Sequence, residues 1–193
     1  MRTQYHDFLR EYVALGHMVP VQDDGENISK VCYLPHPPIV KESSSTTKVR
    51  VVFDGSAKMS SGHSLNDSLL VGPVVQDELL NQIIRFRKFP IALVADIEKM
   101  YRQISMNPAD RSLQRILWRF DASEPIQAYE LGTVTYGLAP SSFLATRTLL
   151  QLVEDEGIPF PNASTAIKKN VYVDDLIAFE ELQQHRSSHS ATR

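Results

Sequence analysis

The chain has 193 residues, of which 42% are hydrophobic and 22% charged, and its formal net charge is −3. This composition indicates a globular protein with one substantial core or two small subdomains. No apolar run approaches a membrane span, and Met1–Asp7 lacks the basic and apolar segments of a signal peptide, so we expect an intracellular protein. Its one cysteine, Cys32, excludes an internal disulfide and is expected to be buried, and the six histidines show no paired spacing suited to zinc.

Charge is unevenly distributed along the chain. Residues 85–119 contain eight basic and three acidic side chains, whereas residues 120–181 contain three basic and ten acidic ones. The basic middle could contact phosphates while the acidic end carries metal ligands, although solvated surface charge explains most such side chains.

Apolar residues with helical spacing begin near the N-terminus and predict an amphipathic helix that ends near Gly16 and packs on a partner surface. They are Tyr5, Phe8, Leu9, Tyr12 and Val13. Polar residues 22–30 predict a loop, and three prolines within Tyr33–Val40 predict extended chain. A Ser/Thr loop over residues 43–47 precedes a strand over Lys48–Phe53, in whose middle Arg50 faces solvent as a lone strand charge usually does.

Residues 56–67 form a Gly/Ser-rich loop, after which Gly72-Pro73 predicts the start of a helix. Its apolar face is expected to be core scaffold, with basic residues 85–88 at the helix end. This face consists of Val75, Leu79, Leu80, Ile83 and Ile84. An apolar run, Phe89–Asp96, then predicts a strand that ends in a carboxylate and is followed by helix formers.

Residues 115–120 alternate between Arg or Leu and large apolar side chains, which predicts a half-exposed strand with a basic outer face. On its inner face, Trp118 is expected in the core rather than as a stacking platform for a base. Residues 130–143 contain Tyr136-Gly137, and an ordinary turn into a helix is one interpretation of this pair. That helix is expected to close at Gly157, because Pro159 and Pro161 prevent its extension.

Two adjacent carboxylates, Asp174 and Asp175, lie between the apolar runs of Val171–Phe179, which predict a β-hairpin. A solvated acidic turn is one interpretation. The other is a cation site, because like charges on a half-buried hairpin repel unless a cation lies between them. Together with Asp96 they would give the oxygen-rich cluster that hard divalent cations need, and two such ions support in-line phosphoryl displacement.

At these residues the sequence resembles reverse transcriptases. Tyr172–Asp175 is similar to their catalytic box, and Ala95–Ile104 is similar to their first aspartate box. The closest resemblance is to the Pao/BEL group of LTR retrotransposon polyproteins, over about residues 33–179. Glu130–Phe143 resembles the third polymerase box, but with Pro140 two positions earlier than usual and Ser142 in its place.

The resemblance implies roles for individual residues. Asp96, Asp174 and Asp175, with the backbone carbonyl of Ile97, would hold two Mg²⁺ ions, for which Mn²⁺ can substitute. Other residues would contact the nucleotide or nucleic acid. Arg50 and a lysine, Lys41 in preference to Lys48, would grip the triphosphate; Tyr101 would exclude a 2′-hydroxyl; Tyr136 and Gly137 would line the nucleotide pocket; and Asn66 and Tyr172 would lie near the template and primer.

The implied fold is α+β, a right-hand polymerase with fingers and a partial palm, truncated after the hairpin. The expected regions are an N-terminal helix and loop over 1–29 and a polymerase fragment over 30–179. Fingers cover about 30–85 and 107–138, palm about 86–106 and 139–179, and a disordered tail 180–193. Expected partners are an RNA or DNA template-primer and dNTPs, without a membrane, in the cytoplasm. Intact relatives continue with thumb, RNase H and integrase regions, so this chain alone is expected to be a poor polymerase or none.

Two other functions remain open. A palm-type nucleotide cyclase shares the paired carboxylates and two-metal chemistry but needs neither the Tyr136-Gly137 box nor the basic strand. A decayed retroelement relic would bind RNA weakly or only fold. Mg²⁺-dependent primer extension discriminates between these possibilities.

Overall fold

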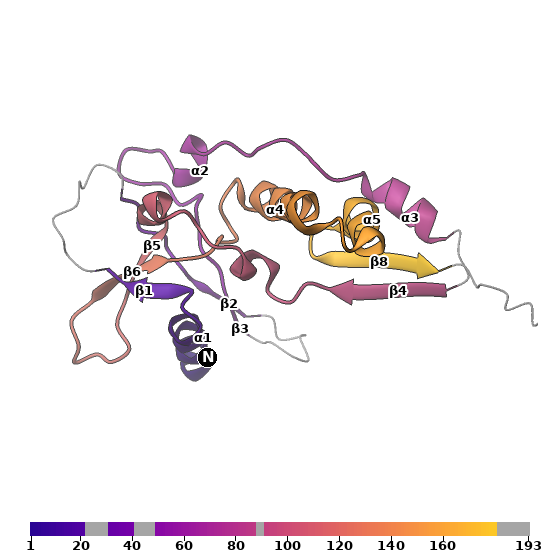
Figure 1. Ribbon diagram of the computed structural model, residues 1–193. Coiled ribbons are helices and arrows are strands. Elements are labelled where there is room, and N and C mark those ends of the chain that lie inside the picture. The colour runs from indigo at the N-terminus through magenta and orange to yellow at the C-terminus, as the bar shows by residue number, and fades with distance from the viewer. Residues whose placement is uncertain (22–30, 41–48, 88–90, 181–193) are drawn as a thin grey trace, which may run out of the picture. The chain divides into compact units, whose positions relative to one another are not determined.

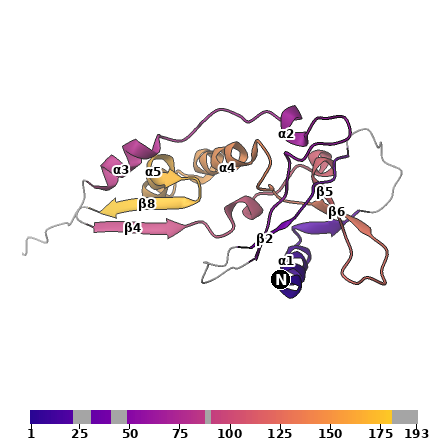
Figure 2. The same cartoon turned by 180° about the vertical axis from the view of Figure 1, so that it is seen from behind.

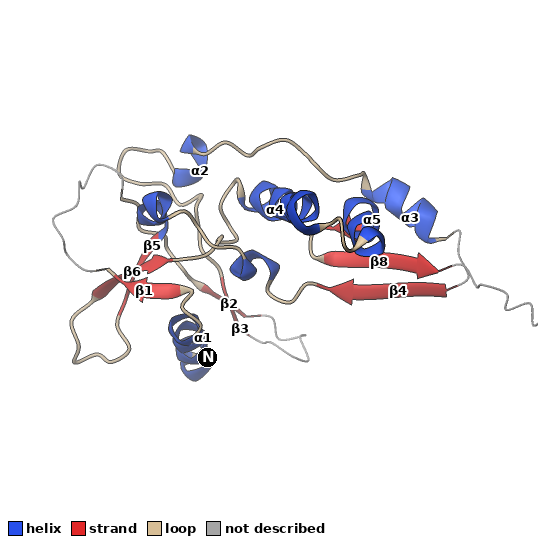
Figure 3. Ribbon diagram, in the orientation of Figure 1, coloured by secondary structure: helices blue, strands red, loops and turns tan. Residues whose placement is uncertain are grey.

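The computed structural model describes residues 1–21, 31–40, 49–87 and 91–180. It combines helices with three antiparallel sheets (Figure 3). The first sheet has the order β1 (Met18–Pro20), β6 (Gln127–Leu131), β5 (Arg115–Trp118). The second pairs β2 (Pro38–Val40) with β3 (Val49–Val51), and the third has the order β4 (Ile91–Asp96), β8 (Asp175–Glu180), β7 (Val171–Tyr172). The mixture of helix and sheet agrees with the expected α+β class and is not specific to polymerases.

The chain divides into two compact units, each formed by two separate stretches (Figure 1). Unit 1 comprises Met1–Val74 and Lys99–Thr148, and unit 2 comprises Val75–Glu98 and the chain from Leu149 onward. Helices α1 (Arg2–Ala14) and α2 (Leu65–Ser68) belong to unit 1, as do 3₁₀ segments over Met100–Gln103 and Pro108–Gln114. Helices α3 (Leu79–Phe86) and α5 (Pro161–Asn170) belong to unit 2, and α4 (Ser141–Glu156) begins in unit 1 and ends in unit 2. Among the described helices, none is long and apolar enough to cross a membrane.

The core of unit 1 collects apolar side chains from α1 and the first two sheets. It contains Tyr5, Leu9, Tyr12, Met18, Cys32, Leu34, Val51, Phe53, Leu65, Ile116 and Leu131. The predicted N-terminal helix is therefore present, but it packs on β1 and β3 of its own unit rather than on a partner surface (Figure 2). Cys32 is buried as expected, which raises the pKa of its thiol, and Trp118 packs against this core as predicted.

Strand β5 differs from its prediction at Arg115. Ile116 and Trp118 face inward as expected, but Arg115 is buried rather than part of a basic outer face. Its guanidinium binds the carboxylate of Glu130, the paired residue on β6, with NH2 at 2.6 Å from Oε1. The chain around Cys32 covers this position, because the Arg115 N–H donates to the Cys32 carbonyl at 3.0 Å. Burial of the charge is therefore accompanied by an ion pair, as such burial requires.

In unit 2, α3 and α5 pack on the central strand β8 (Figure 1). The predicted helix after Gly72-Pro73 begins only at Leu79, and its apolar face is not core scaffold. The side chains of Leu79, Leu80, Ile83 and Ile84 are 37–62% exposed, whereas Gln82 is only 3% exposed. The helix thus turns a polar residue inward.

The end of the chain contains one helix that the sequence pattern did not indicate. Helix α4 ends at Glu156, next to the predicted Gly157, but Pro161 then opens α5. Proline is favourable at this first helical position because it lacks an N–H that would need a partner. Strand β8 extends through Glu180, which the predicted tail had included. The predicted loops over 22–30 and 43–47, Lys41, Lys48 and the tail beyond Glu180 lie outside the described residues.

Candidate functional site

The hairpin and the aspartate strand form one sheet in unit 2. The apolar run after Pro90 forms β4, and Leu176 and Ile177 begin the run that forms β8. The two strands are antiparallel along their whole length, with Ile91 opposite Glu180 and Asp96 opposite Asp175. Directly opposed residues of antiparallel strands project from the same face of a sheet. The register therefore places the carboxylates of Asp96 and Asp175 on one face at one end of the sheet.

The turn of the hairpin consists of Val173 and Asp174, between the paired residues Tyr172 and Asp175. Val173 has a left-handed φ of 57°, an uncommon conformation for a β-branched residue, although tight hairpins often need a positive φ here. The Ile97 N–H donates to the Asp174 carbonyl at 2.8 Å, so the turn is attached to the end of β4. This bond brings the backbone of the third aspartate to the same sheet end.

All three aspartates are exposed, and within the described parts of the chain no cation or hydrogen-bond donor is found on their carboxylates. Carboxylate oxygens are the donors that Mg²⁺ and Mn²⁺ prefer, so this donor set fits the expected ions. The side chains themselves do not converge: within the described residues, no group of three or more His, Cys, Asp or Glu is placed to hold a metal. The fold aligns the three backbone positions, whereas the ligand geometry is not formed.

Three residues predicted to line the nucleotide or template lie together in unit 1, where each supports the fold. The Tyr136 hydroxyl donates to the Val51 carbonyl at 2.6 Å, and burial raises the pKa of this phenol. Gly137 has a φ of 94°, and a Cβ at this position would lie 2.0 Å from the Phe53 carbonyl oxygen. The missing side chain therefore admits the backbone of Phe53.

Asn66 connects the segment around Ser56 to the segment Gly137–Ala139. Its Nδ2 donates to the Gly137 carbonyl at 3.0 Å and to Ser56 Oγ at 2.9 Å, and its Oδ1 accepts from the Ala139 N–H at 2.8 Å. Because its amide already makes three bonds within the chain, Asn66 fixes the loop that carries Tyr136 and Gly137.

The remaining predicted residues are divided between the units. Arg50 is exposed in the middle of β3, opposite Ile39, and Tyr101 is half-buried in unit 1 with its hydroxyl 3.2 Å from Ser142 Oγ. Tyr172 lies in unit 2 beside the aspartates, half-buried and paired with Asp175. Lys41 lies outside the described residues.

Sequence reasoning missed two residues at the aspartate hairpin, Gln76 and Gln82, whose side chains bond its backbone. The sequence pattern carried no signal for Gln82, because it lies outside the apolar stripe of the predicted helix and is therefore expected on the solvent-facing polar side.

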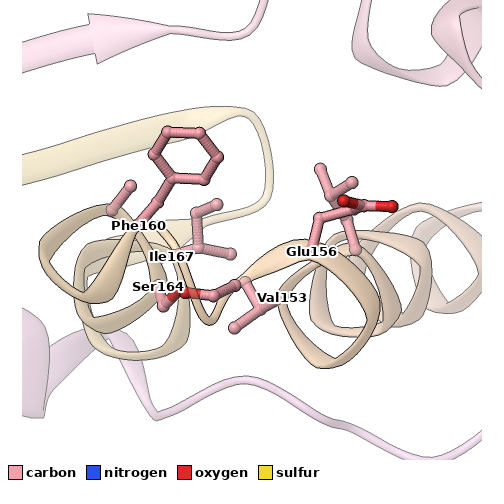
Figure 4. Close-up of a pocket in the computed structure, with 8 residues that line it drawn as sticks. Val153, Glu156, Phe160, Ser164 and Ile167 are labelled. Carbon is pink, nitrogen blue, oxygen red and sulfur yellow. The ribbon is translucent and has the colours of Figure 1, made fainter.

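Unit 2 also contains an apolar cavity of about 240 Å³ between the end of α4 and α5. Figure 4 shows Val153 and Glu156 on the α4 side, and Phe160, Ser164 and Ile167 on the other. The Ser164 hydroxyl donates to the Gly157 carbonyl at 2.9 Å. Apart from Glu156, the lining offers no acid, base or metal ligand. The cavity is therefore a packing feature of the two helices and not a second site for the chemistry of the aspartates.

A scan against models of known protein families finds no match, and a search of curated proteins finds none either.

Proposed function

We propose that this chain is the fingers and partial palm of an RNA-directed DNA polymerase that carries out template-directed nucleotidyl transfer. The observation that supports this most directly is the pairing of Asp96 with Asp175, together with the bond from the Ile97 N–H to the Asp174 carbonyl. These contacts bring the backbones of three aspartates from two distant parts of the sequence to one end of a sheet. The resemblance of Ala95–Ile104 and Tyr172–Asp175 to polymerase boxes adds the reaction type.

In this proposal Asp96, Asp174 and Asp175 hold Mg²⁺, with the Ile97 carbonyl as a further oxygen ligand. The bound ions would supply Lewis acidity to the 3′-hydroxyl and the triphosphate. The exposure of all three side chains leaves them accessible to solvent ions and to a nucleotide. The partners would be a template-primer duplex and dNTPs inside the cell, and Arg50 offers a planar guanidinium suited to phosphate oxygens.

Binding of Mn²⁺ to the purified chain, measured by electron paramagnetic resonance, tests the metal site directly. We expect the wild type to bind Mn²⁺ and Asp174→Asn to bind it at least about tenfold more weakly, because one anionic ligand is lost. Asp155→Asn is the matched control, since it removes the same charge from an exposed position on α4 in the same unit. Equal affinities for wild type and Asp174→Asn would overturn the proposal.

Incubation of the chain with a primed RNA template, Mg²⁺ and one complementary dNTP then tests the reaction. Addition of a single nucleotide, lost in Asp96→Asn, supports the polymerase. Cyclic nucleotide formed without a template would instead indicate a cyclase, and metal binding without either product would indicate a relic that retains only the site.

A further inference from the structure

The free edge of β7 is occupied by a side-chain amide. β7 is the last strand in the order β4-β8-β7, so its outer N–H and C=O groups have no neighbouring strand within the described sheet. Gln76 Nε2 donates to the Val171 carbonyl at 3.3 Å, and Gln76 Oε1 accepts from the Val173 N–H at 3.2 Å. One carboxamide thus meets a carbonyl and an N–H two residues apart, as the N–H and C=O of one residue in a neighbouring parallel strand would.

Gln82 completes this contact from α3. Its Nε2 donates to the same Val171 carbonyl at 3.2 Å and to the Asp77 carbonyl at 3.3 Å. A carbonyl oxygen has two lone pairs, so Val171 can accept from both glutamines. This explains why α3 turns Gln82 inward at 3% exposure while its apolar residues face solvent.

The same helix is also bonded to the residues that precede β7. Arg85 NH2 donates to the Lys169 carbonyl at 2.6 Å and pairs with the Asp77 carboxylate at 2.8 Å. The polar side of α3 therefore contacts the backbone carbonyls of Lys169 and Val171, which lead into the aspartate turn.

The bond to Val173 holds a strained residue. Val173 has a left-handed φ of 57°, which is unfavourable for a β-branched residue and persists only where the surroundings impose it. Gln76 binds the N–H of this residue, and Ile97 binds the carbonyl of the next one, Asp174. The turn is thus fixed on both sides of the peptide that joins Val173 to Asp174.

We propose that Gln76 and Gln82 form a carboxamide clamp that holds the strained turn and so positions Asp174 and Asp175 for metal binding. This role rests on the proposed function of the aspartates. Neither glutamine is a catalytic residue, because each acts through the backbone of the hairpin.

The variant Gln76→Met tests the clamp, because it removes both hydrogen bonds while preserving side-chain length. We expect its Kd for Mn²⁺ to rise about tenfold, as is usual when an outer-shell partner of a metal site is lost. Gln151→Met, at an exposed position on α4 in the same unit, is the control and should bind Mn²⁺ as the wild type does. The double variant Val173→Gly/Gln76→Met should recover most of the affinity relative to Gln76→Met, because glycine adopts a positive φ without strain.

Amide hydrogen exchange at Val173 provides a readout that does not depend on metal. We expect exchange at this N–H to accelerate at least about tenfold in Gln76→Met and to be unchanged in Gln151→Met, because only the first removes the acceptor. Unchanged exchange would overturn the clamp, and unchanged Mn²⁺ affinity in Gln76→Met would overturn its positioning role. If the wild type binds no Mn²⁺ while exchange still depends on Gln76, the function proposed for the aspartates fails and the clamp stands. If Gln76→Met does not fold, the double variant Val173→Gly/Gln76→Met, compared with Val173→Gly alone, gives the same comparison at this N–H.

Discussion

Asp96 and Asp175 are directly opposed across two neighbouring antiparallel strands, so two negative charges share one position of the ladder. Like charges in this arrangement destabilise a sheet by about 0.2–1 kcal/mol. We therefore expect Asp175→Asn to raise the free energy of unfolding by about that amount when divalent ions are removed with a chelator. Urea denaturation followed by circular dichroism measures the change.

A double-mutant cycle provides the control for this repulsion. Asp96→Asn should stabilise the chain similarly, and the double variant should gain little beyond either single change, because one substitution already removes the repulsion. Additive gains would show that the two charges do not interact. Mn²⁺ should stabilise the wild type more than either variant, since a ligand that binds only the folded state raises its stability.

Gly137 supports a second prediction, because its α-carbon faces the Phe53 carbonyl at a φ of 94°. Gly137→Ala should destabilise unit 1 by about 2–4 kcal/mol, from the left-handed backbone and the steric overlap together. Gly62→Ala is the matched control: Gly62 has a φ of 81°, but its added Cβ would meet nothing within 4 Å. That change should cost only about 1 kcal/mol. Equal losses in thermal or urea denaturation would contradict a close approach at Gly137.

The ion pair between Arg115 and Glu130 gives a third prediction. Glu130→Gln should cost about 1–3 kcal/mol in urea denaturation, because it leaves the buried guanidinium of Arg115 without its counter-charge. Replacing both residues by Met should recover part of this loss, since no buried charge remains. Glu124→Gln, at an exposed turn position, should change stability little. A loss in the double variant as large as that in Glu130→Gln would argue against this explanation.

A pH dependence follows from His17 in unit 1. Burial, and then the positive charge of Arg102, lower the pKa of His17, whose Nδ1 accepts from Arg102 Nε at 3.0 Å. Glu11 acts in the opposite direction and Lys99 in the same direction as Arg102. The folded state therefore binds the His17 proton less readily than the unfolded state does. The contribution of neutral His17 to the free energy of unfolding is complete above the unfolded pKa of about 6.5, and it is lost as pH falls through the lower pKa of the folded state.

The test replaces His17 by a neutral acceptor that does not titrate. Between pH 7 and pH 5, His17→Asn should lose less stability in urea denaturation than the wild type does. His63→Asn, at an exposed position, is the control and should follow the wild type. Parallel pH profiles for wild type and His17→Asn would contradict the assignment.

The sequence predicted the elements of the site because their signals are local. Apolar runs flank Asp96 and the aspartate pair, and each became a strand of the third sheet. The register between β4 and β8 could not be read from these runs, since it depends on contacts between residues about 80 positions apart. β1 and β6 were also missed, because short strands of mixed polarity carry little alternation and are formed by their pairing with each other.

Burial was the least predictable property. The spacing of Leu79, Leu80, Ile83 and Ile84 does predict a helix, but periodicity cannot say which element will cover its apolar face. In α3 the bonds of Gln82 and Arg85 to backbone carbonyls determine the inward side. The burial of Arg115 was missed for a related reason, because the segment that covers it, around Cys32, is far away in the sequence.

Cys32 makes the stability of unit 1 measurable separately from that of the hairpin. It is the single cysteine of the chain, it is buried in unit 1, and its neighbours bind its backbone on both sides, through Ser112 and Arg115. A thiol reagent can modify it only when this region opens, so the labelling rate relative to that of a free thiol gives the free energy of local opening. Changes confined to the aspartate turn should leave this rate unchanged, whereas Gly137→Ala should accelerate it. One native side chain thus serves as an internal reporter for assigning each variant's effect to one half of the molecule.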